Sequence, residues 1–161
     1  MRILGVDPGL LNLGCVLIEV SGGNFQILES MTLKTRPEDS SAKRLYYLYS
    51  HFKKFLEISA PEVLAIEEPL AKANPYTTAK VFQAQGIVLL LAEERQIPLK
   101  IYHPSYWKSF LCKNGKASKL EVYNFLKTLM GEQNFENILK DNHMVDALAL
   151  ALVCALELKV F

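Results

Sequence analysis

The sequence predicts an α/β protein in which helices flank a five-stranded mixed sheet. Short apolar runs of strand length alternate with longer segments of helical periodicity. Three of the strand-like runs precede the first helical segment, and the turn residues at 21–24 join the second run to the third. Strands joined by a tight hairpin are antiparallel, whereas strands joined through a helix are usually parallel neighbours. The two kinds of connection together predict a mixed sheet.

The expected elements follow from these patterns. We expect strands at residues 2–7, 13–20, 25–33, 63–68 and 99–102. We expect helices at about 42–58, 77–96, 104–112, 118–130 and 143–159. The last helix is apolar around nearly its whole circumference, which predicts that it is buried.

Composition indicates one globular domain over residues 1–161. The chain is 50% hydrophobic and 22% charged, and it contains no repeat, low-complexity tract or linker. Three widely separated cysteines without a C-x-x-C pair argue against a disulfide framework. No signal-peptide pattern is found, and the longest apolar run is too short to cross a bilayer. We therefore expect a cytoplasmic protein that is not bound to a membrane.

The formal net charge of +1 conceals a basic stretch at residues 95–127. This stretch contains seven lysines or arginines and a single acid, Glu121. It could follow a phosphate backbone, although such a stretch taken alone is more often a solvated lysine-rich surface.

Two of the expected strands end in an acid with a small residue two positions earlier. Because side chains alternate across a strand, Gly5 and Asp7 share one face, as do Ala65 and Glu67. If the first and fourth strands are parallel neighbours, the two acids stand side by side. We expect Gly5 and Ala65 to leave room for a bulky group on this active face.

A third acid, Asp146, lies in the first turn of the last helix, three residues after His143 and on the same face. Asp146 could simply interact with the helix dipole, and His143 could be a surface histidine. The apolar helix must pack on the sheet, however, and it would carry Asp146 inward. Clustered carboxylates require cations, and two Mg²⁺ ions, or Mn²⁺, suit such ligands. The sequence thus predicts a two-metal nuclease on a ribonuclease H-like sheet.

Three ordered motifs resemble the RuvC family of bacterial Holliday junction resolvases. They are Ile-Leu-Gly-Val-Asp-Pro-Gly (3–9), Ala-Ile-Glu (65–67) and Asp-Ala-Leu-Ala (146–149). Gln-Ala-Gln-Gly (83–86) resembles the family's Gln-Ala-Arg-Gly with one change. The similarity extends over essentially the whole chain, at the family's order and spacing.

The resemblance implies catalytic metal ligands at Asp7, Glu67, His143 and Asp146. His143 stands where many members of the family have Asp, which affects the expected choice between Mg²⁺ and Mn²⁺. Leu70 occupies the position of an aromatic side chain that contacts the junction centre, and Tyr76 is the alternative for that contact. The expected DNA-binding residues are Leu70, Lys72, Asn74, Tyr76, Lys108, Lys113, Lys116 and Lys119.

The resemblance also implies partners. The family acts as a homodimer on four-way junction DNA, and a branch-migration helicase complex is a further possible partner. Three other hypotheses stay open: an actin-like phosphotransferase fold, a junction-binding module that has lost catalysis, and a RuvC-like nuclease of RNA processing.

Overall fold

A computed structural model describes residues 1–71, 73–131, 135 and 141–160 of the chain. The strands are β1 (Arg2–Asp7), β2 (Asn12–Ser21), β3 (Asn24–Lys34), β4 (Val63–Glu67) and β5 (Leu99–Tyr102). The helices are α1 (Ser41–Ser59), α2 (Pro75–Glu94), α3 (Pro104–Cys112), α4 (Lys119–Met130) and α6 (Asn142–Glu157). Within the described ranges, none of the helices is both long and apolar enough to cross a membrane.

The strands form a mixed sheet in the order β3-β2-β1-β4-β5. The pairs β1–β2 and β2–β3 are antiparallel, and the pairs β1–β4 and β4–β5 are parallel. Gly22 and Gly23 both have positive φ, at 58° and 84°, as a tight hairpin turn between β2 and β3 requires. The predicted fold class is therefore confirmed, and the first and fourth strands are parallel neighbours, which the sequence left open.

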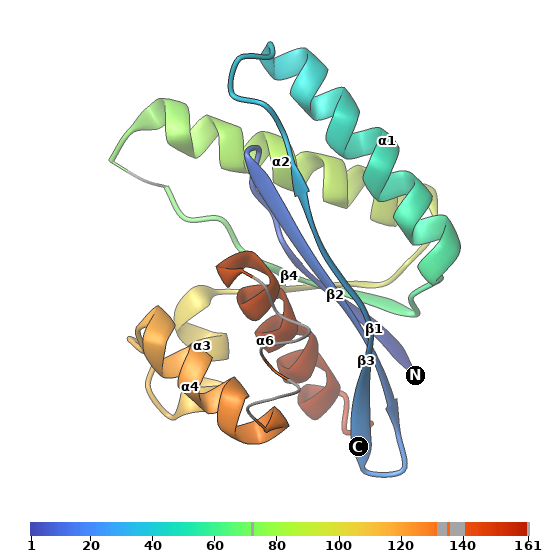
Figure 1. Cartoon of the computed structure of the whole chain (residues 1–161), viewed down its shortest axis with the longest axis vertical. Helices are drawn as coiled ribbons and strands as arrows, with labels where there is room; N and C mark the ends of the chain where they lie inside the picture. Colours follow the sequence, from blue (N-terminus) through green and yellow to red (C-terminus); the bar gives the residue numbers. More distant parts are fainter. Residues whose placement is uncertain (72, 132–134, 136–140, 161) are drawn as a thin grey trace.

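Helices cover both faces of the sheet. Figure 1 shows α1 and α2 on one face and α3, α4 and α6 on the other. The strand alternation divides the core accordingly: Leu4 and Val6 face α1 and α2, whereas Ile3 faces α6. The predicted burial of the last helix is confirmed, because α6 contributes eleven buried residues.

Gly5 leaves room for a bulky group, as expected, and that group is the backbone of α6. A Cβ atom built on Gly5 would lie 1.8 Å from the carbonyl oxygen of Ala147 in α6. The backbone of α6 therefore fills the space above Gly5, and a glycine is needed for this close helix-to-strand approach.

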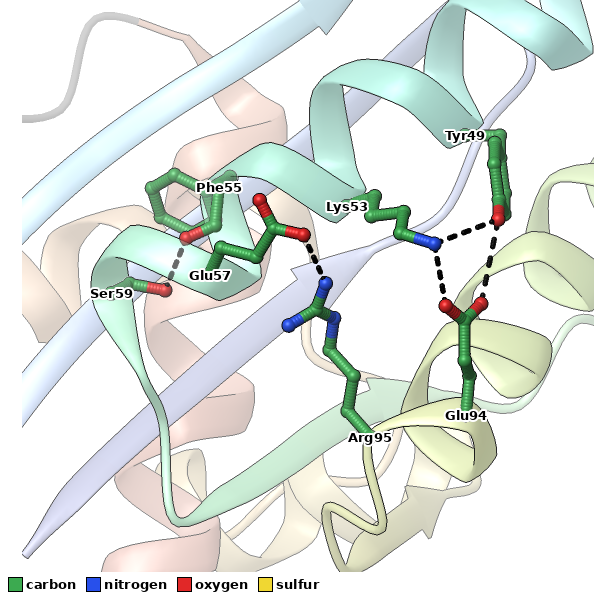
Figure 2. A network of polar contacts seen from close by, with 7 residues as sticks. All are labelled: Tyr49, Lys53, Phe55, Glu57, Ser59, Glu94 and Arg95. Carbon is green, nitrogen blue, oxygen red and sulfur yellow. Dashed lines mark hydrogen bonds and ion pairs between the residues drawn. The ribbon is translucent and has the colours of Figure 1, made fainter.

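Two polar clusters join α1 to α2 (Figure 2). Nζ of Lys53 lies 2.5 Å from Oε1 of Glu94, and the hydroxyl of Tyr49 donates a hydrogen bond to the same carboxylate. One turn further along, the Arg95 guanidinium pairs with Glu57. These contacts hold the C-terminal end of α2 against α1.

The helix boundaries lie within two residues of the predicted ones, and those of α3 coincide with the prediction. The helix α2 begins at Pro75 because the side chain of Asn74 accepts a hydrogen bond from the backbone N–H of Tyr76. It ends before Gln96, whose φ of 54° lies in the left-handed region. The helix α6 ends before Lys159, whose φ is 53°.

Candidate active site

The candidate site begins where β1 and β4 end. Val6 pairs with Ile66, so the next residues along these parallel strands are Asp7 and Glu67. Both side chains lie on the face that α6 covers, because they alternate with Val6 and Ile66. On the other side of Asp7, the register places Gly14 of β2 directly opposite.

The N-terminus of α6 rests on the same row of the sheet. A Cβ atom on Gly14 would lie 2.5 Å from the carbonyl oxygen of His143, so this glycine also permits a close approach. Asp141, the N-cap of α6, accepts hydrogen bonds from the N–H of Met144 and from the Thr32 hydroxyl, both at 3.1 Å. These contacts place Nδ1 of His143 at 2.7 Å from Oδ2 of Asp7, to which it donates a hydrogen bond.

A cavity of about 400 Å³ opens at this edge of the sheet. All four predicted ligands line it, together with Lys108, Lys119 and Leu70. The remaining lining residues are Pro8, Gly9, Pro69, Val81, Pro104, Trp107 and Val122. The structure therefore brings together three acids, one imidazole and two ammonium groups from β1, β4, α3, α4 and α6.

Glu67 and Asp146 hold their protons more tightly than free carboxyl groups do. Burial raises the pKa of Glu67 to about 7, with a further rise from the charges of Asp7 and Asp146. Burial and the charge of Asp7 raise the pKa of Asp146 to about 6. The hydrogen bond to Asp7 raises the pKa of His143, against the lowering effect of burial. Burial therefore disfavours the charged form of these carboxylates in the metal-free site, and a bound cation would favour it.

Trp107 is a site residue that the sequence analysis missed. Its indole Nε1–H donates a hydrogen bond of 2.7 Å to Oε2 of Glu67. Its ring also lies beneath Lys108, with Nζ 5.5 Å from the ring centroid. An apolar side chain on an amphipathic helix predicts only burial, so the sequence pattern contained no signal for this contact.

The donor set suits a hard divalent cation, although the side chains are not gathered into a ready-made metal cluster. Among the residues described, no group of three or more His, Cys, Asp or Glu side chains has that arrangement. His143 and Trp107 each occupy one carboxylate oxygen, on Asp7 and Glu67 respectively. Within the described part of the chain, no hydrogen bond reaches Oδ1 of Asp7, Oε1 of Glu67 or either carboxylate oxygen of Asp146. Carboxylate oxygens of this kind are preferred ligands of Mg²⁺ and Mn²⁺.

Comparison with known proteins identifies the family. The family described as crossover junction endodeoxyribonuclease RuvC matches residues 3–154 of the chain. The RuvC protein of Pseudothermotoga lettingae is 36% identical over 151 residues, which cover 94% of this chain and 91% of that protein. This chain belongs to the RuvC family.

Other RuvC relatives agree over the same length. The RuvC protein of Thermotoga petrophila is 36% identical over 157 residues, which cover 98% of this chain and 93% of the relative. Thermus thermophilus RuvC, in a structure with a Holliday junction substrate, is 29% identical and superimposes with a TM-score of 0.87 over 99% of this chain and 95% of that one. The yeast mitochondrial Holliday junction resolvase, at 20% identity and a TM-score of 0.66 over 92% of this chain and 75% of that one, shares the fold.

The expected DNA-binding residues of this RuvC-family chain separate into two groups. Lys108, Lys119 and Leu70 line the cavity, as stated above. Among the others, Tyr76 is 80% exposed, Asn74 caps α2, and Lys113 and Lys116 are exposed but do not line the cavity. Lys72 lies outside the described residues.

The basic stretch at 95–127 does not form one continuous surface. Arg95 pairs with Glu57 of α1, and Lys100 pairs with Glu157 of α6. Both cations are therefore committed to ion pairs away from the cavity. The local charge that a phosphate would meet at the cavity comes from Lys108 and Lys119.

Proposed function

We propose that this chain resolves four-way DNA junctions by nicking two opposite strands symmetrically through metal-dependent phosphodiester hydrolysis. The observation that carries the proposal is the convergence of Asp7, Glu67, His143 and Asp146 on one cavity that two lysines also line. Membership of the RuvC family supports the same conclusion. A DNA substrate is also consistent with the expected cytoplasmic location.

The four converging side chains are the proposed ligands of two Mg²⁺ ions, with Mn²⁺ as the alternative. When bound, the cations would activate a water molecule and stabilise the leaving 3′ oxygen. Asp7 holds His143 in place through their hydrogen bond, which fixes the orientation of the imidazole. Lys108 and Lys119 supply positive charge at the mouth of the cavity, where they would bind the phosphates that flank the cut.

A gel assay with synthetic four-way junctions tests this proposal. We expect paired nicks with ligatable ends in Mg²⁺ or Mn²⁺, and weaker or no cutting of duplex, single-stranded DNA or RNA. The Asp7→Asn variant should abolish cleavage and preserve junction binding, because the variant loses a metal ligand and keeps both lysines. Junction binding without cleavage by the wild type in either ion would instead support a non-catalytic module. Preferential cutting of RNA would support the RNA-processing alternative.

We further propose that the active form is a homodimer that uses the outer face of α2. Phe82 and Leu90 are 46% and 59% exposed on this face, and Gly86 lies between them at helical spacing. A Cβ atom on Gly86 would meet nothing within 4 Å in the subunit, so the glycine is not needed for internal packing. A junction with two-fold symmetry is met most simply by a two-fold symmetric protein.

Sedimentation analysis tests this surface. Leu90→Ser should raise the dimer dissociation constant by at least about tenfold, which corresponds to about 1.4 kcal/mol. Leu129→Ser is the matched control, because Leu129 is 51% exposed on α4, on the other side of the sheet. Equal effects of the two variants would contradict the assignment to α2. The expected helicase partner stays a prediction.

A further inference from the structure

The buried tryptophan beside the candidate site has a polar contact that core packing does not require. Trp107 is 1% exposed and packs in the core cluster that contains α6. A leucine or phenylalanine would also fill an apolar site of this kind. What tryptophan adds is an N–H donor, and that donor lies 2.7 Å from Oε2 of Glu67.

This hydrogen bond restricts a flexible side chain. A glutamate has three rotatable side-chain bonds, so an unsupported carboxylate would sample several orientations in an open cavity. Trp107 is held by its own packing, and its N–H is therefore a fixed reference point for Oε2. Oε1 of Glu67 accepts no hydrogen bond from the residues that the structure describes, so it is available to a ligand in the cavity.

We propose that Trp107 is a positioning residue that orients Glu67 toward the bound cations. The inference rests on the proposed function, because it takes Glu67 as a metal ligand. Partners that hydrogen-bond to a ligating carboxylate typically contribute about 10–100-fold to metal affinity or activity. Loss of the indole N–H alone should therefore weaken metal binding and leave junction binding without metal unchanged.

The variant Trp107→Phe separates the N–H from the aromatic ring. We expect the dissociation constant for Mn²⁺, measured from the electron paramagnetic resonance signal of free Mn²⁺, to rise by at least about tenfold. Junction affinity in EDTA should stay within about twofold of wild type, because Lys108 still has an aromatic ring beneath it. Tyr106→Phe is the matched control: it also removes a hydrogen bond to a carboxylate, from the Tyr106 hydroxyl to Glu157 at 3.0 Å, but Tyr106 does not line the cavity.

The chain contains a single tryptophan, which gives a second measurement on the wild-type fold. A uniformly ¹⁵N-labelled sample should show one indole N–H cross-peak. Titration with Mg²⁺ should shift this cross-peak, and the Mg²⁺ concentration at half the full shift should match the concentration that gives half-maximal cleavage. Replacement of tryptophan by benzothienylalanine keeps both rings and removes the N–H, and it should reproduce the loss of Mn²⁺ affinity. If Trp107→Phe fails to fold, the benzothienylalanine protein still tests whether the indole N–H contributes to Mn²⁺ affinity.

The outcomes distinguish the two proposals. If the wild type binds Mn²⁺ and cuts junctions while both tryptophan replacements bind Mn²⁺ with unchanged affinity, the role of Trp107 is refuted and the proposed function stands. If the wild type neither binds Mn²⁺ nor cuts junctions, the proposed function fails, and the inference that rests on it fails too.

Discussion

The raised pKa of Glu67 predicts that the metal-free protein loses stability as the pH increases. The native carboxyl holds its proton up to about pH 7, whereas the unfolded chain releases it near 4.5. Between these values the native state binds more protons than the unfolded state, so the free energy of unfolding falls with rising pH. Relative to a carboxyl whose pKa does not change on folding, the raised pKa of Glu67 lowers the free energy of unfolding by about 1 kcal/mol at pH 5 and by about 3 kcal/mol at pH 8.

The variant Glu67→Gln removes this penalty. Urea denaturation in EDTA should show that the stability of the variant relative to wild type increases by about 2 kcal/mol between pH 5 and pH 8. The change with pH is the quantity to compare, because the effect of the amide on packing is independent of pH. Water in the open cavity screens the charges, so the change of about 2 kcal/mol is an upper bound.

Glu68→Gln is the matched control, since Glu68 is exposed and does not line the cavity. This variant should follow the pH profile of wild type. Saturating Mg²⁺ or Mn²⁺ should restore most of the wild-type stability at pH 8, because the cation neutralises the cluster. Parallel pH profiles of wild type and Glu67→Gln would refute the argument that burial of Glu67 strains the metal-free fold.

Three further variants test other parts of the site. Gly5→Ala should destabilise the protein by about 3 kcal/mol or more in urea denaturation, because its Cβ would collide with the backbone of α6; an unchanged midpoint would show that α6 can shift freely. His143→Asp should retain junction cleavage with its preference moved from Mn²⁺ toward Mg²⁺, since oxygen replaces nitrogen; loss of activity in both ions would show that the imidazole has another role. Thr32→Val should cost about 1 kcal/mol through the lost hydrogen bond to the N-cap of α6, and a stability equal to wild type would indicate that this contact does not hold the helix.

The sequence alone predicted the five strands to within one residue of their observed ends. Alternation along 2–7 and 63–67 placed Asp7 and Glu67 on the same face as Gly5 and Ala65, and the observed register brings those faces together. The apolar circumference of the last helix likewise predicted that it is buried against the sheet. These features follow from local periodicity, which a single sequence records directly.

The tertiary structure decided what the local patterns left open. The pattern predicted room for a bulky group above Gly5, and the tertiary structure shows that this group is the α6 backbone. Of the basic residues at 95–127, Lys108 and Lys119 line the cavity, while Arg95 and Lys100 pair with acids elsewhere. The distances between these groups depend on how helices pack across the sheet.

The contact between Trp107 and Glu67 illustrates the physical reason. The two residues are 40 positions apart, and no periodicity links an indole on α3 to a carboxylate at the end of β4. Periodicity determines which face of an element is buried. Only the packing of α3 against the sheet determines that the buried indole N–H meets this carboxylate, and that packing is set by the whole core at once.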